Sequence, residues 1–236
     1  MTVLLLARDL NPSDDRLVRA LTEWGVPVFR TDLAAFPQTL SLDVLWVNHP
    51  GRESDAVKPR QLDVARRCGL SVPDSQVTNR PDGVRGFARG RGGALVCKTL
   101  GGALRAESGR LQMAYTRRLD MAELDDLAGV DTTLHFFQPF VSKSFEARVT
   151  VVGDRIFAAA IRAKSDSARV DWARVDWRAD YDALDYSIIE PPESVTTGML
   201  AFLRVFGLSF GAFDFAITPS GDWVMFECNR PASTGG

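Results

Sequence analysis

Apolar positions near the N-terminus form two short runs separated by a segment with helical spacing. The run in residues 1–7 predicts a buried strand, and the apolar residues within Asp14–Trp24 recur on one helical face. Gly25 is a common type of helix stop, and the apolar run Val26–Arg30 follows it. This β-α-β order predicts a small parallel sheet, which is an opening that serves many functions.

The middle of the chain alternates between helical spacing and short extended runs. The pattern predicts helices over Lys58–Cys68 and Met121–Leu127, and strands over Ala94–Leu100 and Gln112–Arg118. Glycines flank the strand that carries Lys98 on both sides. Such a strand is typical of a mobile flap, and flexible connectors have the same pattern.

From residue 135 onward the pattern is mostly that of strands. Gly153-Asp154 lies between two apolar runs, which is a hairpin signal. The polar segment Ser165–Ser187 is expected to be a loop excursion. The remaining predicted elements are three strands, one helix and a final hairpin: His135–Val141, Phe145–Val152, Arg155–Arg162, Glu193–Phe206 and Gly211–Asn229.

The final hairpin, FDFAIT-PSGD-WVMFECN, carries three oxygen-bearing side chains at regular spacing. A four-residue Pro-Ser-Gly-Asp loop pairs Thr218 with Trp223 and places Asp214 opposite Glu227, with Cβ atoms about 4.5–5.5 Å apart. Asn229 follows Glu227 by two residues and therefore points the same way. The apolar residues expected on the other face are Phe213, Phe215, Ile217, Val224 and Phe226.

Two opposed carboxylates in an apolar hairpin repel each other unless a cation lies between them. Mg²⁺ prefers oxygen ligands and combines one or two carboxylates with substrate phosphates. Asp214, Glu227 and Asn229 therefore predict a magnesium site. The alternative is a solvent-exposed face that happens to carry ordinary acidic residues.

A metal–phosphate site also needs cationic partners. Of 28 basic residues only four are lysines, Lys58, Lys98, Lys143 and Lys164, so each lysine is a candidate for a position that needs a compact ammonium group. The segment 145–162 adds Arg148 and Arg162. A two-residue turn pairs Arg148 with Ala159 and Arg162 with Phe145, which puts the two arginines on opposite faces unless a bulge intervenes.

Composition argues against several other classes of function. A net charge of −2 gives no general case for nucleic acid or anionic membranes. No signal peptide or spanning segment is expected, and three cysteines without CxxC spacing indicate free thiols in a cytoplasmic protein. Two distant histidines argue against a zinc site. His135 is expected to be packed rather than catalytic, and Cys97 to be buried on the face opposite Lys98.

Several segments of the chain together resemble the ATP-grasp superfamily. Lys58 opens a helix ending in GLSVP, and VCKTLGG, FFQPFVSKSFEARVTVVGDRIFAAAIR and GAFDFAIT-PSGDWVMFECN follow in matching order over residues 45–229. VNHPGRESDAVKPRQL, VPDSQVTNRP, VDWR at 175–178 and the closing ECN are most similar to the peptide maturases that cross-link ribosomally made precursors (graspetides, the microviridin type). The ribosomal-protein glutamate ligases share the same core.

The resemblance implies an α/β (α+β) ATP-grasp fold with three domains. These are an N-terminal α/β domain over residues 1–57, a central domain with the flap over 58–134, and a C-terminal antiparallel-sheet domain over 135–236. Family members carry a longer N-terminal domain where this chain passes from Asp43 to Leu45, and they continue beyond Asn229 with a Gly-rich stretch and a helix. Segments are therefore expected to be missing at both places.

The resemblance also implies an ADP-forming carboxylate–amine or carboxylate–hydroxyl ligase that uses ATP and one or two Mg²⁺ ions. A side-chain carboxylate of the precursor becomes an acyl phosphate, and a hydroxyl or amine then attacks it. The implied partner is a precursor peptide with a leader and a core of Asp/Glu plus Ser/Thr/Lys, and the enzyme is expected to be a homodimer.

The family roles map onto residues of this chain as follows. Lys58, Lys98 and Arg162 hold ATP phosphates with added charge from Lys143, and Arg148 binds the activated carboxylate or γ-phosphate, so that Arg148, Arg162 and Lys98 are the catalytic set. The remaining assignments are backbone groups of Gln138, Pro139, Phe140 and Val141 for adenine, Asp214, Glu227 and Asn229 for Mg²⁺, and Asp176, Trp177 and Arg178 for the leader.

Two other functions are compatible with the same residues. One is an amino-acid ligase of the glutamate-ligase type. The other is a non-catalytic relative that binds peptide or nucleotide, against which the intact acidic trio argues.

Overall fold

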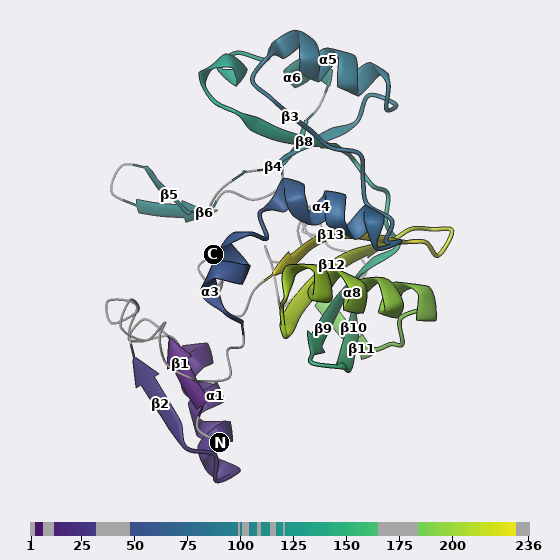
Figure 1. Cartoon of the computed structure of the whole chain (residues 1–236). Helices are drawn as coiled ribbons and strands as arrows, with labels where there is room; N and C mark the ends of the chain where they lie inside the picture. The colour runs from purple at the N-terminus through teal and green to yellow at the C-terminus, as the bar shows by residue number, and fades with distance from the viewer. Residues whose placement is uncertain are drawn as a thin grey trace. The chain divides into compact units, whose positions relative to one another are not determined.

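A computed structural model of the chain (Figure 1) describes residues 3–6, 12–31, 48–98, 100, 104–107, 110–113, 117–119, 121–164 and 184–229. The chain divides into two compact units, Met1–His49 and Pro50–Gly236. The boundary after His49 lies before the predicted end of the N-terminal domain, and the division into three domains stays a prediction. Among the described residues, no helix is long and apolar enough to cross a membrane.

The first unit contains the predicted β-α-β arrangement. β1 (Val3–Leu6) pairs in parallel with β2 (Val28–Thr31), and α1 (Pro12–Glu23) connects them. The register joins Val3 to Val28, and Gly25 has a φ of 68° after the helix end. The small parallel sheet predicted from the sequence is therefore confirmed.

A five-stranded antiparallel sheet dominates the second unit, with the order β11-β10-β9-β12-β13. The segment predicted as a loop up to Ser187 is wrong at its end, because residues 184–187 pair with β10 as part of an edge strand. The strands of this sheet are β9 (Phe145–Val152), β10 (Arg155–Ala163), β11 (Leu184–Ile188), β12 (Phe210–Ile217) and β13 (Trp223–Asn229).

One face of this sheet forms the main hydrophobic core. Ala147, Val149 and Val151 alternate along β9 and are essentially inaccessible to solvent. Figure 1 shows α8 (Glu193–Phe206) lying along the sheet, and its apolar stripe, including Met199 and Phe202, packs against these residues. The opposite face of the sheet carries both polar and apolar side chains, among them Arg148 and Asp214 of the candidate site.

Helix α4 (Lys58–Arg67) closes the core beside β13 and packs against α8. The approach is close, because a Cβ at Gly198 of α8 would lie 2.6 Å from a methyl carbon of Leu70, just after α4. The short helix α3 (Pro50–Ser54) precedes α4. The position of α4 fixes the first-turn residue Lys58 next to the end of β13.

A second sheet of four strands has the order β3-β8-β4-β7, and α5 and α6 cover one of its faces (Figure 1). A separate hairpin contains β5 and β6. These elements are β3 (Gln76–Thr78), α5 (Pro81–Arg89), β4 (Leu95–Lys98), β5 (Leu104–Glu107), β6 (Arg110–Met113), β7 (Arg117–Leu119), α6 (Met121–Asp125), the 3₁₀ turn η2 (Val130–Thr132) and β8 (His135–Pro139).

One strand prediction in this region is corrected. The single strand expected over Gln112–Arg118 is wrong, because its ends belong to two different strands, β6 and β7, in two different sheets. β8, the first strand of the predicted C-terminal domain, pairs with β3 and β4 and not with the five-stranded sheet. The strand carrying Lys98 and the predicted adenine hinge are therefore direct neighbours in one sheet.

Candidate metal and nucleotide site

The opposition of Asp214 and Glu227 is confirmed by the strand register. The predicted pairing of Thr218 with Trp223 is wrong, because Ile217 faces Trp223 and the Thr218 amide donates to the Asp222 carbonyl over 3.0 Å. The three pairs next to the loop are therefore shifted by one residue from the predicted register. A one-residue bulge in β13, opposite the step from Phe215 to Asp214, reverses this shift and restores the predicted opposition of Asp214 and Glu227.

The bulge changes which residues of β13 reach the core. Met225 and Cys228 are buried in the main core, whereas Val224 and Phe226 are only half-buried. Val224 and Phe226 were predicted to fill that face, and this part of the prediction is wrong. The partners Phe213, Phe215 and Ile217 on β12 lie in the core as predicted.

Asn229 joins the two carboxylates. Its Nδ2 donates to Asp214 Oδ2 over 2.8 Å and lies 3.5 Å from Glu227 Oε1. Asp214 is only 4% exposed, so the trio forms a partly enclosed group of oxygen-bearing side chains. A half-turn of the Asn229 amide would present Oδ1 where Nδ2 now lies.

This donor set fits Mg²⁺. Two carboxylates and an amide carbonyl are hard oxygen ligands, which Mg²⁺ combines with waters and substrate phosphates. The trio contains neither His nor Cys, and its all-oxygen ligands suit a hard cation rather than zinc.

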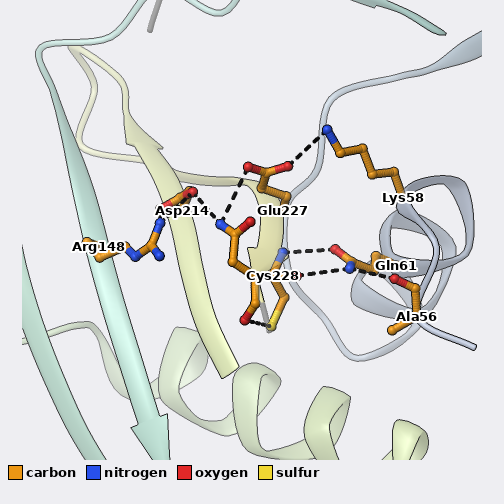
Figure 2. A network of polar contacts seen from close by, with 8 residues as sticks. Ala56, Lys58, Gln61, Arg148, Asp214, Glu227 and Cys228 are labelled. Atoms are coloured by element: carbon orange, nitrogen blue, oxygen red, sulfur yellow. Dashed lines mark hydrogen bonds and ion pairs between the residues drawn. The ribbon is translucent and has the colours of Figure 1, made fainter. Parts of the chain in front are cut away.

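Two cations from different elements balance the two carboxylates (Figure 2). Arg148 on β9 donates through one guanidinium nitrogen to both oxygens of Asp214, at 2.7 and 3.0 Å. Lys58 Nζ at the start of α4 lies 3.3 Å from Glu227 Oε2. A cation in the first helical turn is disfavoured by the helix dipole, so its pairing with Glu227 offsets a local cost.

Arg162 is not brought together with Arg148. Arg148 faces Ala159 in the register predicted from the two-residue turn, and Arg162 is three residues further along β10, on the opposite face. Its guanidinium lies 4.3 Å from the Phe145 ring centroid and donates to Ser187 Oγ over 2.6 Å. The geometry gives no support to its proposed contact with phosphate.

Lys98 and Lys143 make different contacts. Lys98 Nζ lies 4.7 Å from the ring centroid of Phe226, the residue beside Glu227, so β4 directs its ammonium toward β13. Lys143 forms a buried ion pair with Glu146 on β9, two residues from Arg148. The Lys98 ammonium group therefore lies near the edge strand β13, and the Lys143 ammonium group lies near the face of the sheet that carries the trio.

No protein-family model matches the sequence, and no curated protein sequence matches it. Solved structures do match. The macrocyclase MdnC from Microcystis aeruginosa MRC, bound with precursor peptide MdnA, is 21% identical over 97% of this chain and 91% of its own, with a TM-score of 0.81. A RiPP-associated ATP-grasp ligase from Chryseobacterium gregarium, in complex with ADP and a leader and core peptide, is 19% identical over 97% of this chain and 89% of its own, with a TM-score of 0.80.

The chain has the ATP-grasp fold. A third match, the ATP-grasp ligase PsnB complexed with minimal precursor, Mg and ADP, is 20% identical over 99% of this chain and 70% of its own, with a TM-score of 0.63. The fold class predicted from the sequence is thereby confirmed.

In this ATP-grasp chain the predicted adenine hinge spans the last two residues of β8 and the two residues after it. Gln138 faces Val96 of β4, and the Phe140 amide donates to the Ala94 carbonyl over 2.8 Å. Because backbone groups alternate in direction along a strand, the carbonyl of Pro139, a residue without an N–H, points away from β4. The amide of Phe140 is already used and the Gln138 side chain is buried against Ser75, and the assignment of the four hinge residues to adenine stays a prediction.

The remaining predictions for the ATP-grasp chain concern its cysteines and the leader contacts. Cys97 packs against the core beneath α5, and its Sγ lies 4.0 Å from His135 Nδ1, on the face opposite Lys98 as expected, but it is only partly buried. All three cysteines are free. The predicted leader contacts Asp176, Trp177 and Arg178 lie outside the described residues.

Sequence reasoning missed Gln61, whose side chain is hydrogen-bonded to the backbone between Glu227 and Asn229. The available signal was its position on α4, where it shares a buried stripe with Leu62 and Ala65. A glutamine on such a stripe needs buried hydrogen-bond partners.

Proposed function

We propose that the chain is an ATP-dependent, ADP-forming ligase that makes intramolecular ester or amide cross-links in a ribosomally made precursor peptide. The observation that carries the proposal is the opposed pair Asp214 and Glu227, bridged by Asn229 and flanked by Arg148 and Lys58, within an ATP-grasp fold. MdnC, the Chryseobacterium ligase and PsnB were each solved with precursor peptide, and the last two with ADP.

In this proposal Asp214, Glu227 and Asn229 hold one or two Mg²⁺ ions. When bound, the metal would neutralise negative charge on the phosphates that take part in the transfer. Lys58 and Lys98 approach the same strand end from two elements, and both would contact phosphate oxygens. Their ammonium groups add to the electrostatic stabilisation that phosphoryl transfer requires.

Two balanced steps make up the proposed reaction. A carboxylate oxygen of the precursor attacks the γ-phosphorus, the bond to the β–γ bridging oxygen breaks, and ADP leaves. A hydroxyl or amine of the same peptide then attacks the acyl carbon, phosphate leaves, and the nucleophile releases its proton. Arg148 would bind the acyl phosphate, because a guanidinium has five N–H donors in a planar fork that matches the oxygens of a phosphate group.

A peptide substrate is supported by the sheet face that carries Arg148. Arg148 faces Ala159, and Ala159 faces Ile188 on the edge strand β11, so the three residues share one face. Ile188 is 92% exposed, and Phe157 and Tyr186, each two residues away along their strands, are about half exposed. An apolar strip beside a cation suits an extended peptide with acidic side chains.

The test is to incubate the protein with ATP, Mg²⁺ and a candidate precursor, and to measure the mass of the peptide. The candidate is a short peptide encoded next to the gene, with repeated Thr/Ser/Lys and Asp/Glu in its tail. Loss of one water mass per cross-link, with one ADP formed, is the expected result. Gain of an amino-acid residue mass would instead support the glutamate-ligase type.

A variant of the trio tests whether the mass loss depends on the metal site. Glu227→Gln removes one charge from the trio without changing its shape and should slow the mass loss by about 10²-fold or more. Unchanged peptide mass with wild-type protein that still binds nucleotide would overturn the ligase proposal in favour of a non-catalytic relative.

A further inference from the structure

The side chain of Gln61 is joined to the backbone of β13 at a single residue, Cys228. The Cys228 amide donates to Gln61 Oε1 over 2.8 Å, and Gln61 Nε2 donates to the Cys228 carbonyl over 2.9 Å. A third hydrogen bond runs from Nε2 to the Ala56 carbonyl over 2.8 Å. Gln61 is 5% exposed, and Figure 2 shows its amide lying against the strand.

This reciprocal pair has the form of a strand-to-strand contact. β13 is at the edge of its sheet, so the outward backbone groups of Cys228 have no neighbouring strand among the described residues. The amide of Gln61 offers one donor and one acceptor in the arrangement of a peptide group, and it takes the place of that strand. A helix thereby covers an edge that would otherwise be open.

A second anchor lies on the other side of the bulge. The Met225 amide donates to the Ser71 carbonyl over 2.8 Å, and Val224 forms a bridge to Ser71. Phe226 and Glu227 lie between the two anchors. The irregular part of β13 is therefore fixed at both ends by the chain segment that begins with α4.

We propose that Gln61 is a positioning residue that holds Glu227 and Asn229 in the geometry that binds the divalent cation. The inference rests on the proposed function, because it assumes that these residues are metal ligands. Cys228 lies between the two ligands, so a clamp on its backbone sets the direction of both side chains. Lys58 is about one helical turn before Gln61 and contacts the Glu227 carboxylate, so α4 fixes both the backbone and the charge.

Residues that orient metal ligands affect metal affinity more than they affect the fold. Loss of such a partner typically weakens metal binding by roughly 10- to 100-fold. A purely structural role for Gln61 would lower stability and leave the metal requirement of nucleotide binding unchanged. The two roles are therefore separable by measuring both quantities.

The experiment compares wild-type protein with Gln61→Met, which keeps the size of the side chain and removes all three hydrogen bonds. The probe is N-methylanthraniloyl-ADP, and its fluorescence is followed as Mg²⁺ is added. We expect the Mg²⁺ concentration for half-maximal binding to rise roughly 10-fold or more, with binding restored at excess Mg²⁺. Hydrogen exchange at the Cys228 amide of metal-free protein should also become faster, because its acceptor is gone.

A matched variant controls for lost stability. Val84→Ala removes two methyl groups from the other hydrophobic core, beneath α5 and away from the trio. It should lower the melting temperature without changing the Mg²⁺ requirement. If Gln61→Met does not fold, Gln61→Glu is the second variant, since it keeps the acceptor for the Cys228 amide and should show a smaller shift.

The possible outcomes distinguish the two proposals. Wild-type protein that binds no nucleotide in the presence of Mg²⁺ would overturn the proposed function, and the positioning role with it. Wild-type protein that binds Mg²⁺ and nucleotide, with the same Mg²⁺ requirement in the Gln61 variants, would overturn the positioning role alone. A shift shared equally by Val84→Ala would also overturn it, because it would reflect general loss of stability.

Discussion

Asp214 and Glu227 face each other directly although the part of their hairpin next to the loop is out of step with that pairing by one residue. The bulge responsible lies at Phe226, immediately before Glu227. It turns the Glu227 carboxylate onto the face of Asp214 and leaves the Phe226 ring near Lys98, at 4.7 Å. The bulge at this one residue thus sets the opposition of the two carboxylates, and its ring contacts a lysine on another sheet. Bulges commonly re-aim side chains next to active sites in this way.

The first prediction concerns the charge of the acidic pair. Glu227→Gln keeps the size of the side chain, removes one carboxylate and should reduce ATP turnover by about 10²-fold or more, because the metal and phosphates lose a balancing charge. Stability should change little, since the Lys58 pair that is lost is partly exposed. ADP release per cross-link measures the effect, with the exposed Glu190→Gln as the control. Equal turnover in the two variants would show that Glu227 is not a metal ligand.

The second prediction concerns competition between Arg148 and the cation for Asp214. Arg148→Met removes the guanidinium that balances a buried carboxylate, which should lower the free energy of unfolding by on the order of 3 kcal/mol. A cation bound at Asp214 would supply the missing positive charge. Mg²⁺ should therefore raise the melting temperature of Arg148→Met by more than it raises that of the wild type. An equal or smaller rise in the variant would show that the cation does not bind at Asp214.

The third prediction tests the close packing that positions α4. A Cβ at Gly198 would lie 2.6 Å from Leu70 Cδ2 and 3.1 Å from the backbone carbonyl of Cys68, so Gly198→Ala should cost about 1–3 kcal/mol of unfolding free energy. At Gly86 on α5 a Cβ would meet no atom within 4 Å, so Gly86→Ala should stabilise by up to about 1 kcal/mol through helix propensity. Urea unfolding measures both. A stabilising Gly198→Ala would refute the packing of α8 against the segment after α4.

The sequence was sufficient for the elements whose register a short turn determines. Gly153-Asp154 fixes the pairing of Arg148 with Ala159, and the periodic stripe of Glu193–Phe206 fixes α8. It was insufficient where apolar residues are consecutive. Val224, Met225 and Phe226 are all apolar, so a period of two cannot show which of them reaches the core, and the bulge leaves no separate signal.

Other features were hidden for different physical reasons. Helix α5 contains Gly83 and Gly86, which lower its intrinsic helix propensity, and it was not predicted. Gln61 reaches a backbone 167 residues away, and no spacing rule reports such a contact. The acidic trio was predictable because its three members lie within one hairpin, whereas its supporting residues come from distant segments.

The last prediction concerns the Cys228 thiol behind the trio. Burial, reinforced by the nearby Asp214 carboxylate, raises the pKa of this thiol above its usual value of 9.0. Above that pH the unfolded chain loses the proton while the folded protein retains it, so folding stability present at neutral pH is lost as the pH rises. The contribution of one such group is up to about 1.4 kcal/mol per pH unit.

Urea unfolding between about pH 8 and pH 10.5 should therefore show that the free energy of unfolding falls less steeply with pH in Cys228→Ala than in the wild type. Burial raises the pKa of Cys68 as well, but that thiol is only partly buried, so Cys68→Ala should change the slope less. The small cavity left by Cys228→Ala costs the same at every pH and does not affect the comparison of slopes. Identical slopes in wild type and Cys228→Ala would show that the thiol ionises freely, and that β13 opens enough to admit water beside Asp214.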